Sequence, residues 1–490
     1  MKRFLTCLCI AALLLSLPLG VTAAAEPLKV NGMAMRYNLE PTKDSNFWKW
    51  MEQEFNVDYN VEWVPWDAYN AKLDLILASG DIPDILQIGN MTYPSVQKAA
   101  AAGAFWDLGP LLGPNFENYP GFAKNTSASA WQLNAVKGKM YLVPNTRGSI
   151  NVALFVRKDW LDKLGMALPT TLEEYADYLV AVGTGDLDGN GVNDSIGFIP
   201  NRFFLFDDAF GLRTPHYNEA GGLVHMNFLP EYVDMIAYFR DIYERGGIAK
   251  EYALIKLQQG EELFLNGTLG ALEVNLWHNF RFNDTMKKQN PAYEVEPILF
   301  LKGPKGYVNH FDPGYAGGHV FSKSMSEEKV KAALAFFEKQ TDPKYFNNMF
   351  YGVEGLHYTM VDGVPVLTDL GKQEVTNSLY QPFTWTMDEW SKVNSPLAPP
   401  EYNAAMREKA KALYDIERNV AIWDIIQSET WSTEWPQVRD TFTAMTVKAI
   451  TGEITLDEFH AYQQTFLDNP VYQQTFMEFA QSYTEKFPNN

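Results

Sequence analysis

The sequence predicts an α/β protein in which helices pack on a mostly parallel β-sheet. From residue 28 to residue 198, apolar stretches of strand length alternate with stretches that have helical spacing. Neither an internal repeat nor a low-complexity linker interrupts this order. Because a crossover helix between two strands brings them side by side in the same direction, the alternation favours a parallel sheet.

The expected elements follow in chain order. The first group has strands at 28–37, 57–64 and 85–88 and helices at 47–55, 68–77 and 96–101. A second group begins with a strand at 152–156, which leads directly into a helix at 158–164. The Thr170-Thr171 pair then caps a further helix whose first turn contains Glu173, a pattern that satisfies the free N–H groups at a helix start.

The chain from 400 to 483 is predicted to be mainly helical. Its apolar side chains recur at helical spacing, at Met406, Ala410, Leu413 and Ile416. Trp423 and Ile426 are expected to continue this face. A stripe of this kind is typical of a helix that packs against a core.

The first 25 residues have the composition of a secretory signal peptide. A short basic start precedes an apolar run at 4–21 and a small-residue exit, so cleavage is expected after Ala25. A membrane anchor is the alternative, although Pro18 and Gly20 interrupt the apolar run. Both cysteines, at positions 7 and 9, lie inside this segment, so we expect a mature chain without disulfides or a catalytic thiol.

The composition beyond residue 25 restricts the possible partners. It contains 38 basic against 60 acidic residues, a formal charge of −22, which argues against nucleic acid and anionic membranes as partners. Aromatic residues make up 14% of the chain. Many will lie in the core, but aromatic rings also stack on the apolar faces of sugars. The composition is therefore compatible with a carbohydrate ligand.

An oxygen-rich loop follows the helix that starts near 172. It reads DLDGNGVND, and its candidate ligands for a metal ion are Asp186, Asp188, Asn190, Val192 and Asp194. This is the order in which calcium loops supply oxygens, with Gly191 at the sharp turn. Position twelve is Gly197 instead of glutamate, so a calcium-driven switch is not expected. We predict a structural calcium ion; a metal-free surface turn is the alternative.

Several further segments have a recognisable order. They are EWVPWDAYN at 62–70, LASGDIPDI at 77–85, VRKDWLDKLG at 156–165, PTT at 169–171, the oxygen-rich loop before 196–198, FLNG at 264–267, GVEGLHY at 352–358 and the helical tail after Gly452. Together they span nearly the whole mature chain. In this order they resemble family 1 extracellular solute-binding proteins of ABC importers, in the branch that includes oligosaccharide- and alginate-binding receptors.

The resemblance implies a type II periplasmic-binding-protein fold, in which two α/β lobes are joined by a multi-strand hinge and followed by an extended helical part. It places 26–147 and 273–317 in the first lobe and 148–272 and 318–490 in the second. Such lobes close on a ligand, and a transporter recognises the closed form. The implied function is capture of an oligosaccharide or sugar derivative, by a monomer without enzymatic activity, for ABC permease subunits.

Seven residues are candidates for the ligand-binding cleft: Trp66, Asn90, Arg147, Trp277, Asp312, Tyr315 and Trp385. The aromatic side chains offer stacking platforms, and Arg147 can form paired hydrogen bonds to a carboxylate or to neighbouring hydroxyls. The alternatives are core packing for the tryptophans and a surface ion pair for Arg147. Trp66 and Asn90 follow strands, which is where α/β folds collect ligands.

Three nearby residues are expected to be structural. Gly317 and Gly318 follow Tyr315 and are predicted to allow close passage of the backbone. His278 has no partner at metal-ligand spacing, so we expect an ordinary hydrogen-bonded histidine.

Two other classes of function remain. A secreted hydrolase with paired carboxylates is possible, because 60 acidic residues offer many pairs, but no nucleophile elbow, metal-binding histidine pair or phosphate loop is present. An adhesive protein would show repeats or stalk-like linkers. Since no lipid-accepting cysteine is evident, a diffusible receptor needs an outer membrane to retain it, and we expect a periplasmic location.

Overall fold

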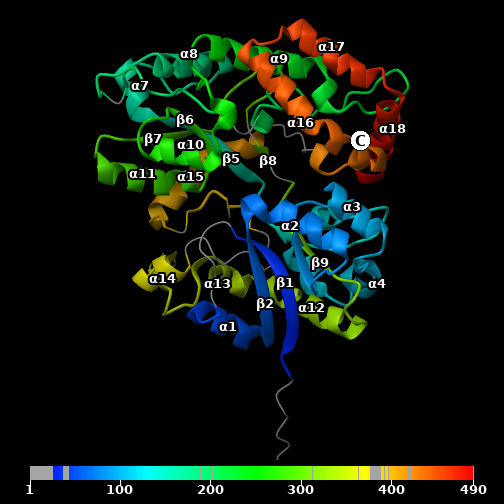
Figure 1. Cartoon of the computed structure of the whole chain (residues 1–490). Helices are drawn as coiled ribbons and strands as arrows, with labels where there is room; N and C mark the ends of the chain where they lie inside the picture. The colour runs from blue at the N-terminus through cyan, green and yellow to red at the C-terminus, as the bar shows by residue number, and fades with distance from the viewer. Residues whose placement is uncertain are drawn as a thin grey trace, which may run out of the picture.

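The chain folds around two separate β-sheets, each covered by helices (Figure 1). The computed structural model describes residues 26–36, 43–187, 189–200, 203–308, 310–311, 313–361, 364–375, 388–390, 392–395, 397–416 and 422–488. The predicted signal peptide at 1–25 lies outside these ranges. Within them, no helix combines the length and the apolar character that crossing a bilayer requires.

The first lobe is built on a five-stranded sheet with the order β2-β1-β3-β9-β4. Its strands are β1 (Leu28–Arg36), β2 (Val57–Pro65), β3 (Ile85–Ile88), β4 (Leu142–Thr146) and β9 (Tyr315–Phe321). β1 pairs in parallel with β2 and β3, whereas β9 runs antiparallel to β3 and β4. The carboxyl ends of β1 to β4 and the start of β9 therefore share one edge.

Helices cover both faces of this sheet. They are α1 (Asn46–Phe55), α2 (Trp66–Ser79), α3 (Pro94–Ala101), α4 (Gly109–Leu112), α5 (Pro120–Asn125), α6 (Ala128–Asn134), α12 (Glu327–Gln340), α13 (Phe346–Tyr351) and α14 (Asp369–Glu374), with a hairpin of β10 (Tyr358–Val361) and β11 (Val364–Leu367). α1 shows why they form. The Ser45 side chain accepts a hydrogen bond from the Trp48 N–H at 3.2 Å, and Phe47, Met51 and Phe55 face the core at helical spacing.

The second lobe is built on a four-stranded sheet around β5 (Ile150–Arg157). β6 (Ala271–Asn275), β7 (Val295–Ile298) and β8 (His310–Phe311) all pair antiparallel with it. The prediction of a mostly parallel sheet thus holds for the first lobe but is wrong for the second. The reason is direction: β5 runs away from the first lobe, whereas β6, β7 and β8 run back toward it.

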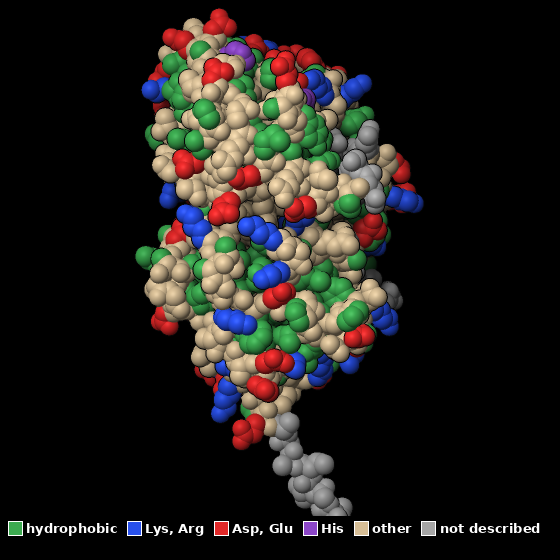
Figure 2. Space-filling view, turned by 90° about the vertical axis from the view of Figure 1, so that its right-hand side faces the viewer, with side chains coloured by type: hydrophobic (Ala, Val, Ile, Leu, Met, Phe, Trp, Pro, Cys, Tyr) green, Lys and Arg blue, Asp and Glu red, His purple; other side chains and the backbone are tan. Residues whose placement is uncertain are grey.

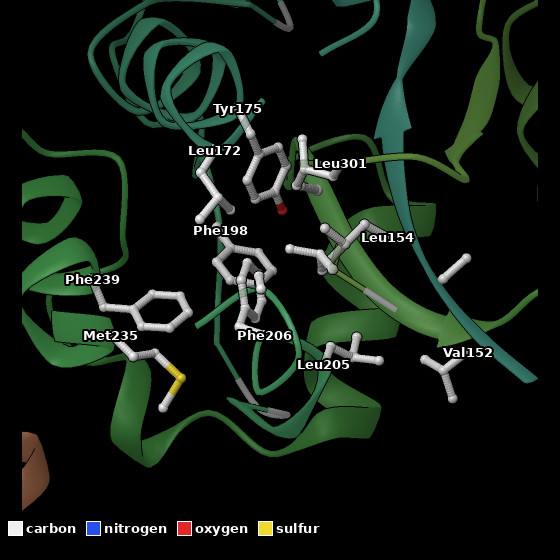
Figure 3. Packing of buried hydrophobic residues seen from close by; sticks show 14 of the residues in the cluster. Val152, Leu154, Leu172, Tyr175, Phe198, Leu205, Phe206, Met235, Phe239 and Leu301 are labelled. Atoms are coloured by element: carbon white, nitrogen blue, oxygen red, sulfur yellow. The ribbon is translucent and has the colours of Figure 1, made fainter. Parts of the chain in front are cut away.

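The helices of the second lobe include the whole C-terminal part of the chain. They are α7 (Lys158–Leu164), α8 (Leu172–Gly183), α9 (Pro230–Glu244), α10 (Leu257–Leu265), α11 (His278–Gln289), α15 (Pro400–Lys411), α16 (Glu429–Thr451), α17 (Leu456–Leu467) and α18 (Pro470–Lys486). Many aromatic rings lie in their core, where Phe206 packs edge-on against Phe239 at 4.9 Å and Tyr175 against Phe198 at 6.0 Å (Figure 3). Such contacts contribute beyond the area they bury.

The C-terminal helices pack as expected. Met406, Ala410, Leu413 and Ile426 are buried in the second core. α16 and α18 also enclose His225, whose ring stacks on Trp431 at 4.3 Å. Burial lowers the pKa of His225 to about 3, so this histidine is neutral at physiological pH.

The predicted lobe boundaries need correction. Residues 273–317 were assigned to the first lobe, but β6, β7 and β8 pair with β5 of the second. Likewise, part of 318–490 belongs to the first lobe, because α12 packs in the first core and β9, which continues to Phe321, lies in the first sheet. The chain passes from one lobe to the other between Thr146 and Ile150, between Phe311 and Tyr315, and again between Val375 and Val393.

Candidate functional site

The two lobes face each other across the sheet edges at which the chain passes between them. In the first lobe this is the edge where β1 to β4 end, and five polar or aromatic residues lie there: Arg36, Trp66, Asn90, Arg147 and Tyr315. Four of these five were predicted as ligand-binding residues. The structure thus brings Trp66, Asn90, Arg147 and Tyr315 to a single edge, although they are far apart in sequence.

Trp66 is the most accessible aromatic residue of this edge. It is the first residue of α2, directly after Pro65 at the end of β2, and its side chain is 53% exposed. Since Tyr69 and Leu73 provide the buried face of α2, the helix does not need Trp66 for its packing. The alternative of core burial for Trp66 is therefore wrong, because more than half of its side chain is exposed.

Asn90 connects the two lobes. It follows β3, and its side-chain oxygen accepts a hydrogen bond from the Thr92 N–H at 2.7 Å, which fixes the amide. Its Nδ2 then donates to the carbonyl oxygen of Asp424 in the second lobe at 3.1 Å. The side chain of Asn90 thus lies directly between the lobes.

Arg147 lies in the first passage between the lobes and is half-buried. Its N–H donates to the Gly314 carbonyl in the second passage at 2.9 Å. The third passage also lies against the first, because a Cβ on Gly148 would lie 2.1 Å from the Glu389 carbonyl oxygen. The passages therefore run side by side. Tyr315, which starts β9 opposite Thr146, is only 6% exposed.

The facing edge of the second lobe is formed by the start of β5 and the end of β6. The Leu276 N–H donates to the Asn151 carbonyl at 2.8 Å, and the Asn275 amide donates to the side-chain oxygen of Asn151. Trp277 follows and is half-buried, with its ring centroid 3.9 Å from that of His278. This places Trp277 near the edge.

His278 behaves as predicted for an ordinary histidine. Its Nδ1 lies 2.6 Å from Nη2 of Arg281 on the next turn of α11. Two further predicted ligand-binding residues, Asp312 and Trp385, lie outside the residues that the structure describes.

The glycines after Tyr315 permit close backbone packing, as expected. A Cβ on Gly317 would lie 2.0 Å from the Ile88 carbonyl oxygen, and one on Gly318 would lie 2.1 Å from that of Val143. Any side chain at either position would push β9 away from its neighbours. Their role is therefore structural.

Carboxylates near the second edge are paired in ways that stabilise the lobe. Arg213 lies within 3.9 Å of Asp207 and 3.4 Å of Asp208, and all three side chains are buried. Burial raises the pKa of Asp207 to about 8, and Arg213 opposes this shift. At the third passage, burial likewise raises the pKa of Asp388, while a hydrogen bond from the Trp390 N–H at 2.9 Å opposes the shift.

The oxygen-rich loop folds around its first carboxylate. Asp186 accepts hydrogen bonds from the N–H groups of Gly189, Asn190 and Gly191 at 2.8, 3.1 and 2.9 Å. The Asn190 amide contacts Asp194 at 3.2 Å, so three of the predicted ligand residues lie together in one turn. Asp188 lies outside the described residues, among which no group of three or more His, Cys, Asp or Glu side chains forms a metal site.

Packing explains the glycine at position twelve of this loop. A Cβ on Gly197 would lie 2.2 Å from the Leu179 carbonyl oxygen and 2.3 Å from that of Gly247. A glutamate cannot be accommodated there. The other candidate ligand atoms of the loop are side-chain and main-chain oxygens, the type that calcium prefers. The residues present therefore fit a calcium ion that is held without a ligand at position twelve.

Several polar contacts between the lobes had no local sequence signal. Asp424 takes part through its main-chain carbonyl, which accepts a hydrogen bond from Asn90. Arg36, which ends β1 at the first-lobe edge, was not predicted either. Ser432 Oγ on α16 donates to Gln97 of α3 at 2.7 Å, and Lys486 at the end of α18 donates to main-chain oxygens at the C-terminal end of α6. A separate groove of about 460 Å³ lies along α18 beside Tyr217, away from all the predicted residues.

Comparisons with known proteins agree with this architecture. The family model described as bacterial extracellular solute-binding protein matches residues 38–345. The polygalacturonan/rhamnogalacturonan-binding protein YtcQ of Bacillus subtilis is 28% identical over 350 residues, which cover 69% of this chain and 68% of that relative.

Solved structures give the same result at the level of the fold. The alginate-binding protein AlgQ2, solved without calcium ion, has a TM-score of 0.71 at 18% identity, covering 94% of this chain and 98% of that one. An EF-hand mutant of the Streptococcus pneumoniae ABC-transporter substrate-binding protein FusA, in complex with fructo-nystose, has a TM-score of 0.68 at 17% identity, covering 93% and 99%. These likenesses show the two-lobed binding-protein fold.

Proposed function

Because the chain belongs to the bacterial extracellular solute-binding protein family, we propose that it captures an oligosaccharide between its two lobes and delivers it to an ABC transporter. The observation that carries this proposal is the first-lobe edge. There, four parallel strands end opposite the second lobe, and the exposed ring of Trp66 lies on the same edge as Asn90 and Arg147.

This arrangement suits a sugar chain. The exposed indole of Trp66 can stack on the apolar face of a sugar ring, and Trp277 offers a second ring from the opposite edge. Asn90 and Arg147 supply hydrogen-bond donors for hydroxyl or carboxylate oxygens. The short passages between the lobes allow the two halves to close on the ligand, and closure is the signal that a transporter can recognise. No covalent step is needed.

The substrate class that fits best is an oligosaccharide with uronate units. Arg36 and Arg147 both lie at the first-lobe edge, in a chain whose net charge of −20 would otherwise repel an anion. A relative of this chain is named for binding polygalacturonan and rhamnogalacturonan. A guanidinium can hold a carboxylate by two parallel hydrogen bonds.

A panel of oligosaccharides tests this function by thermal shift. We expect oligogalacturonides to raise the Tm of the mature chain in a concentration-dependent way. At a ligand concentration of 100 times Kd, the free energy of unfolding should rise by about 2.7 kcal/mol. Neutral fructo- and manno-oligosaccharides serve as comparison ligands. A panel in which no sugar changes the Tm, or in which a sugar is cleaved, would contradict the proposal, the second outcome in favour of the hydrolase.

We also propose that the loop at 186–194 holds a structural calcium ion. Asp186, Asn190 and Asp194 would supply side-chain oxygens, together with Asp188 and the Val192 carbonyl. The ion would neutralise the clustered carboxylates and fix the loop that follows α8. Its role would be stabilisation, at a distance from the sugar.

Removal of calcium is expected to destabilise the protein. A chelator should lower the Tm of the wild-type chain, and added calcium should restore it, because only the folded loop gathers the oxygens. In an Asp194→Ala variant the chelator should have no further effect, because the variant lacks one of the proposed calcium ligands. Asp194 contacts Asn190 inside the loop, so the substitution acts on the loop itself. A wild-type Tm that responds to neither chelator nor calcium would exclude the ion.

The expected location follows from the same function. We propose that residues 1–25 direct export and are removed, and that the mature chain acts as a monomer in the periplasm with the permease subunits of an ABC transporter as partners. The family match to extracellular proteins supports this proposal. Determination of the N-terminal residue of the exported protein would test it, with Glu26 as the expected result.

A further inference from the structure

The two lobes touch at a second place besides the three passages between them. The chain from 422 to 488, which contains α16, α17 and α18, packs in the second core but also contacts the first lobe, and we call it the C-terminal clasp. α16 lies next to α3. Figure 1 shows α16 and α18 above α3 and α4, and Figure 2 shows basic and acidic side chains adjacent along the waist on this side.

Lys486 makes the most specific of these contacts. It is the last residue of α18, and its Nζ donates to the main-chain oxygens of Leu133 at 2.6 Å, Gln132 at 3.3 Å and Ala135. These carbonyls belong to the C-terminal end of α6, whose last carbonyls have no partner within the helix. The three donors of one ammonium group thus match three carbonyls at the negative end of a helix dipole.

Further polar contacts lie along the same side. Ser432 Oγ donates to Gln97 Oε1 at 2.7 Å, and the carbonyl of Asp424 accepts from Asn90 at 3.1 Å. An ion pair between Lys137 and Glu429 at 3.7 Å is highly exposed and adds little. Since α6, α3 and Asn90 all belong to the first lobe, each of these contacts has to break if the lobes separate on this side.

We propose that the C-terminal clasp sets the equilibrium between open and closed lobes, with Lys486 as the residue that holds it. This inference rests on the proposed function only in so far as closure serves ligand capture. The apparent affinity of a protein for its ligand is the intrinsic affinity multiplied by the fraction of molecules in the binding-competent form. Lys486 therefore determines affinity from a position that touches no part of the first-lobe edge where the sugar is proposed to bind.

The test measures lobe separation directly, without a ligand. The chain has cysteines only at positions 7 and 9, so a pair of introduced cysteines labels the mature protein selectively. Ala102, after α3 in the first lobe, and Ala444, on α16 in the clasp, are both exposed. Spin labels at Ala102→Cys and Ala444→Cys report the distribution of distances between the lobes in the unliganded protein.

We expect Lys486→Met to shift this distribution to longer distances and to weaken oligogalacturonide binding about tenfold, the loss typical of a charged hydrogen bond. Lys305→Met is the control, because Lys305 pairs with Glu231 inside the second lobe at 2.7 Å and should change neither result. The Tm of each variant shows that it is folded. A Lys486→Met distribution equal to that of wild type would overturn the proposal even if the sugar binds, and a panel without a binding sugar would leave the distance result standing.

Discussion

Replacement of Trp66 by alanine is expected to weaken oligosaccharide binding by roughly 10- to 100-fold, because central aromatic residues of binding sites contribute about 2 kcal/mol or more. Trp66 is 53% exposed in the unliganded chain and lies outside the buried face of α2. The Tm without ligand should therefore stay close to that of wild type. Isothermal titration with an oligogalacturonide measures the first effect, and calorimetric unfolding measures the second.

Leu75 provides the matched control for this experiment. It lies on the same helix and is 69% exposed, but it is more than two turns away from the edge where β2 ends. Leu75→Ala should leave both affinity and Tm unchanged. If Trp66→Ala binds the sugar as tightly as wild type, Trp66 is not a stacking platform and the proposed position of the ligand is wrong.

Replacement of Gly317 by alanine is expected to destabilise the first lobe by about 3 kcal/mol. Gly317 has a φ of +59°, and a Cβ there would lie 2.0 Å from the Ile88 carbonyl oxygen. The positive φ costs about 1–2 kcal/mol for an L-residue, and the close approach of the added Cβ costs about 1–3 kcal/mol as overpacking. A loss of this size should lower the Tm by roughly 5–10 °C.

Gly80 separates the two contributions. It ends α2 with a φ of +75°, yet apart from its immediate chain neighbours no atom of the described residues lies within 4 Å of the position of an added Cβ. Gly80→Ala should therefore cost only about 1–2 kcal/mol, from backbone conformation alone. Equal Tm values for Gly80→Ala and Gly317→Ala would show that β9 can move away from β3 without cost, which would contradict the packing at this edge.

The order of the elements could be predicted because it is a local property. Apolar residues such as Met33, Leu73 and Ile85 recur with the period of a strand or a helix, whatever lies elsewhere in the chain. The predicted helix at 158–164 and strand at 85–88 have those bounds in the structure. The edge position of Trp66 and Asn90 follows from the same signal, because both come directly after a strand.

The assignment of strands to lobes could not be predicted in the same way. β6, β7 and β8 are short, and their partner β5 lies more than 100 residues earlier. Nothing in Leu272 or Val274 distinguishes a strand of one sheet from a strand of the other. The sheet that these strands join is decided by their direction, and that direction depends on how the chain returns from α10 and α11.

The contacts between the lobes have no local pattern either. Lys486 reads as an exposed residue at a helix end, and its contacts to the carbonyls at the C-terminal end of α6 appear only once both helices are in place. Asn90 and Asp424 are likewise distant in sequence. Sequence patterns therefore indicated the ends of the strands as the site, whereas the geometry of closure required the folded structure.

In the function proposed for this chain, two lobes hold a sugar and release it unchanged. Titration of the mature chain with an oligogalacturonide, followed by mass analysis of the recovered sugar, tests this most directly. We expect saturable binding of one sugar per chain and recovery of the intact oligosaccharide. Shortened sugar in the recovered material, or no binding at any concentration up to the millimolar range, would contradict it.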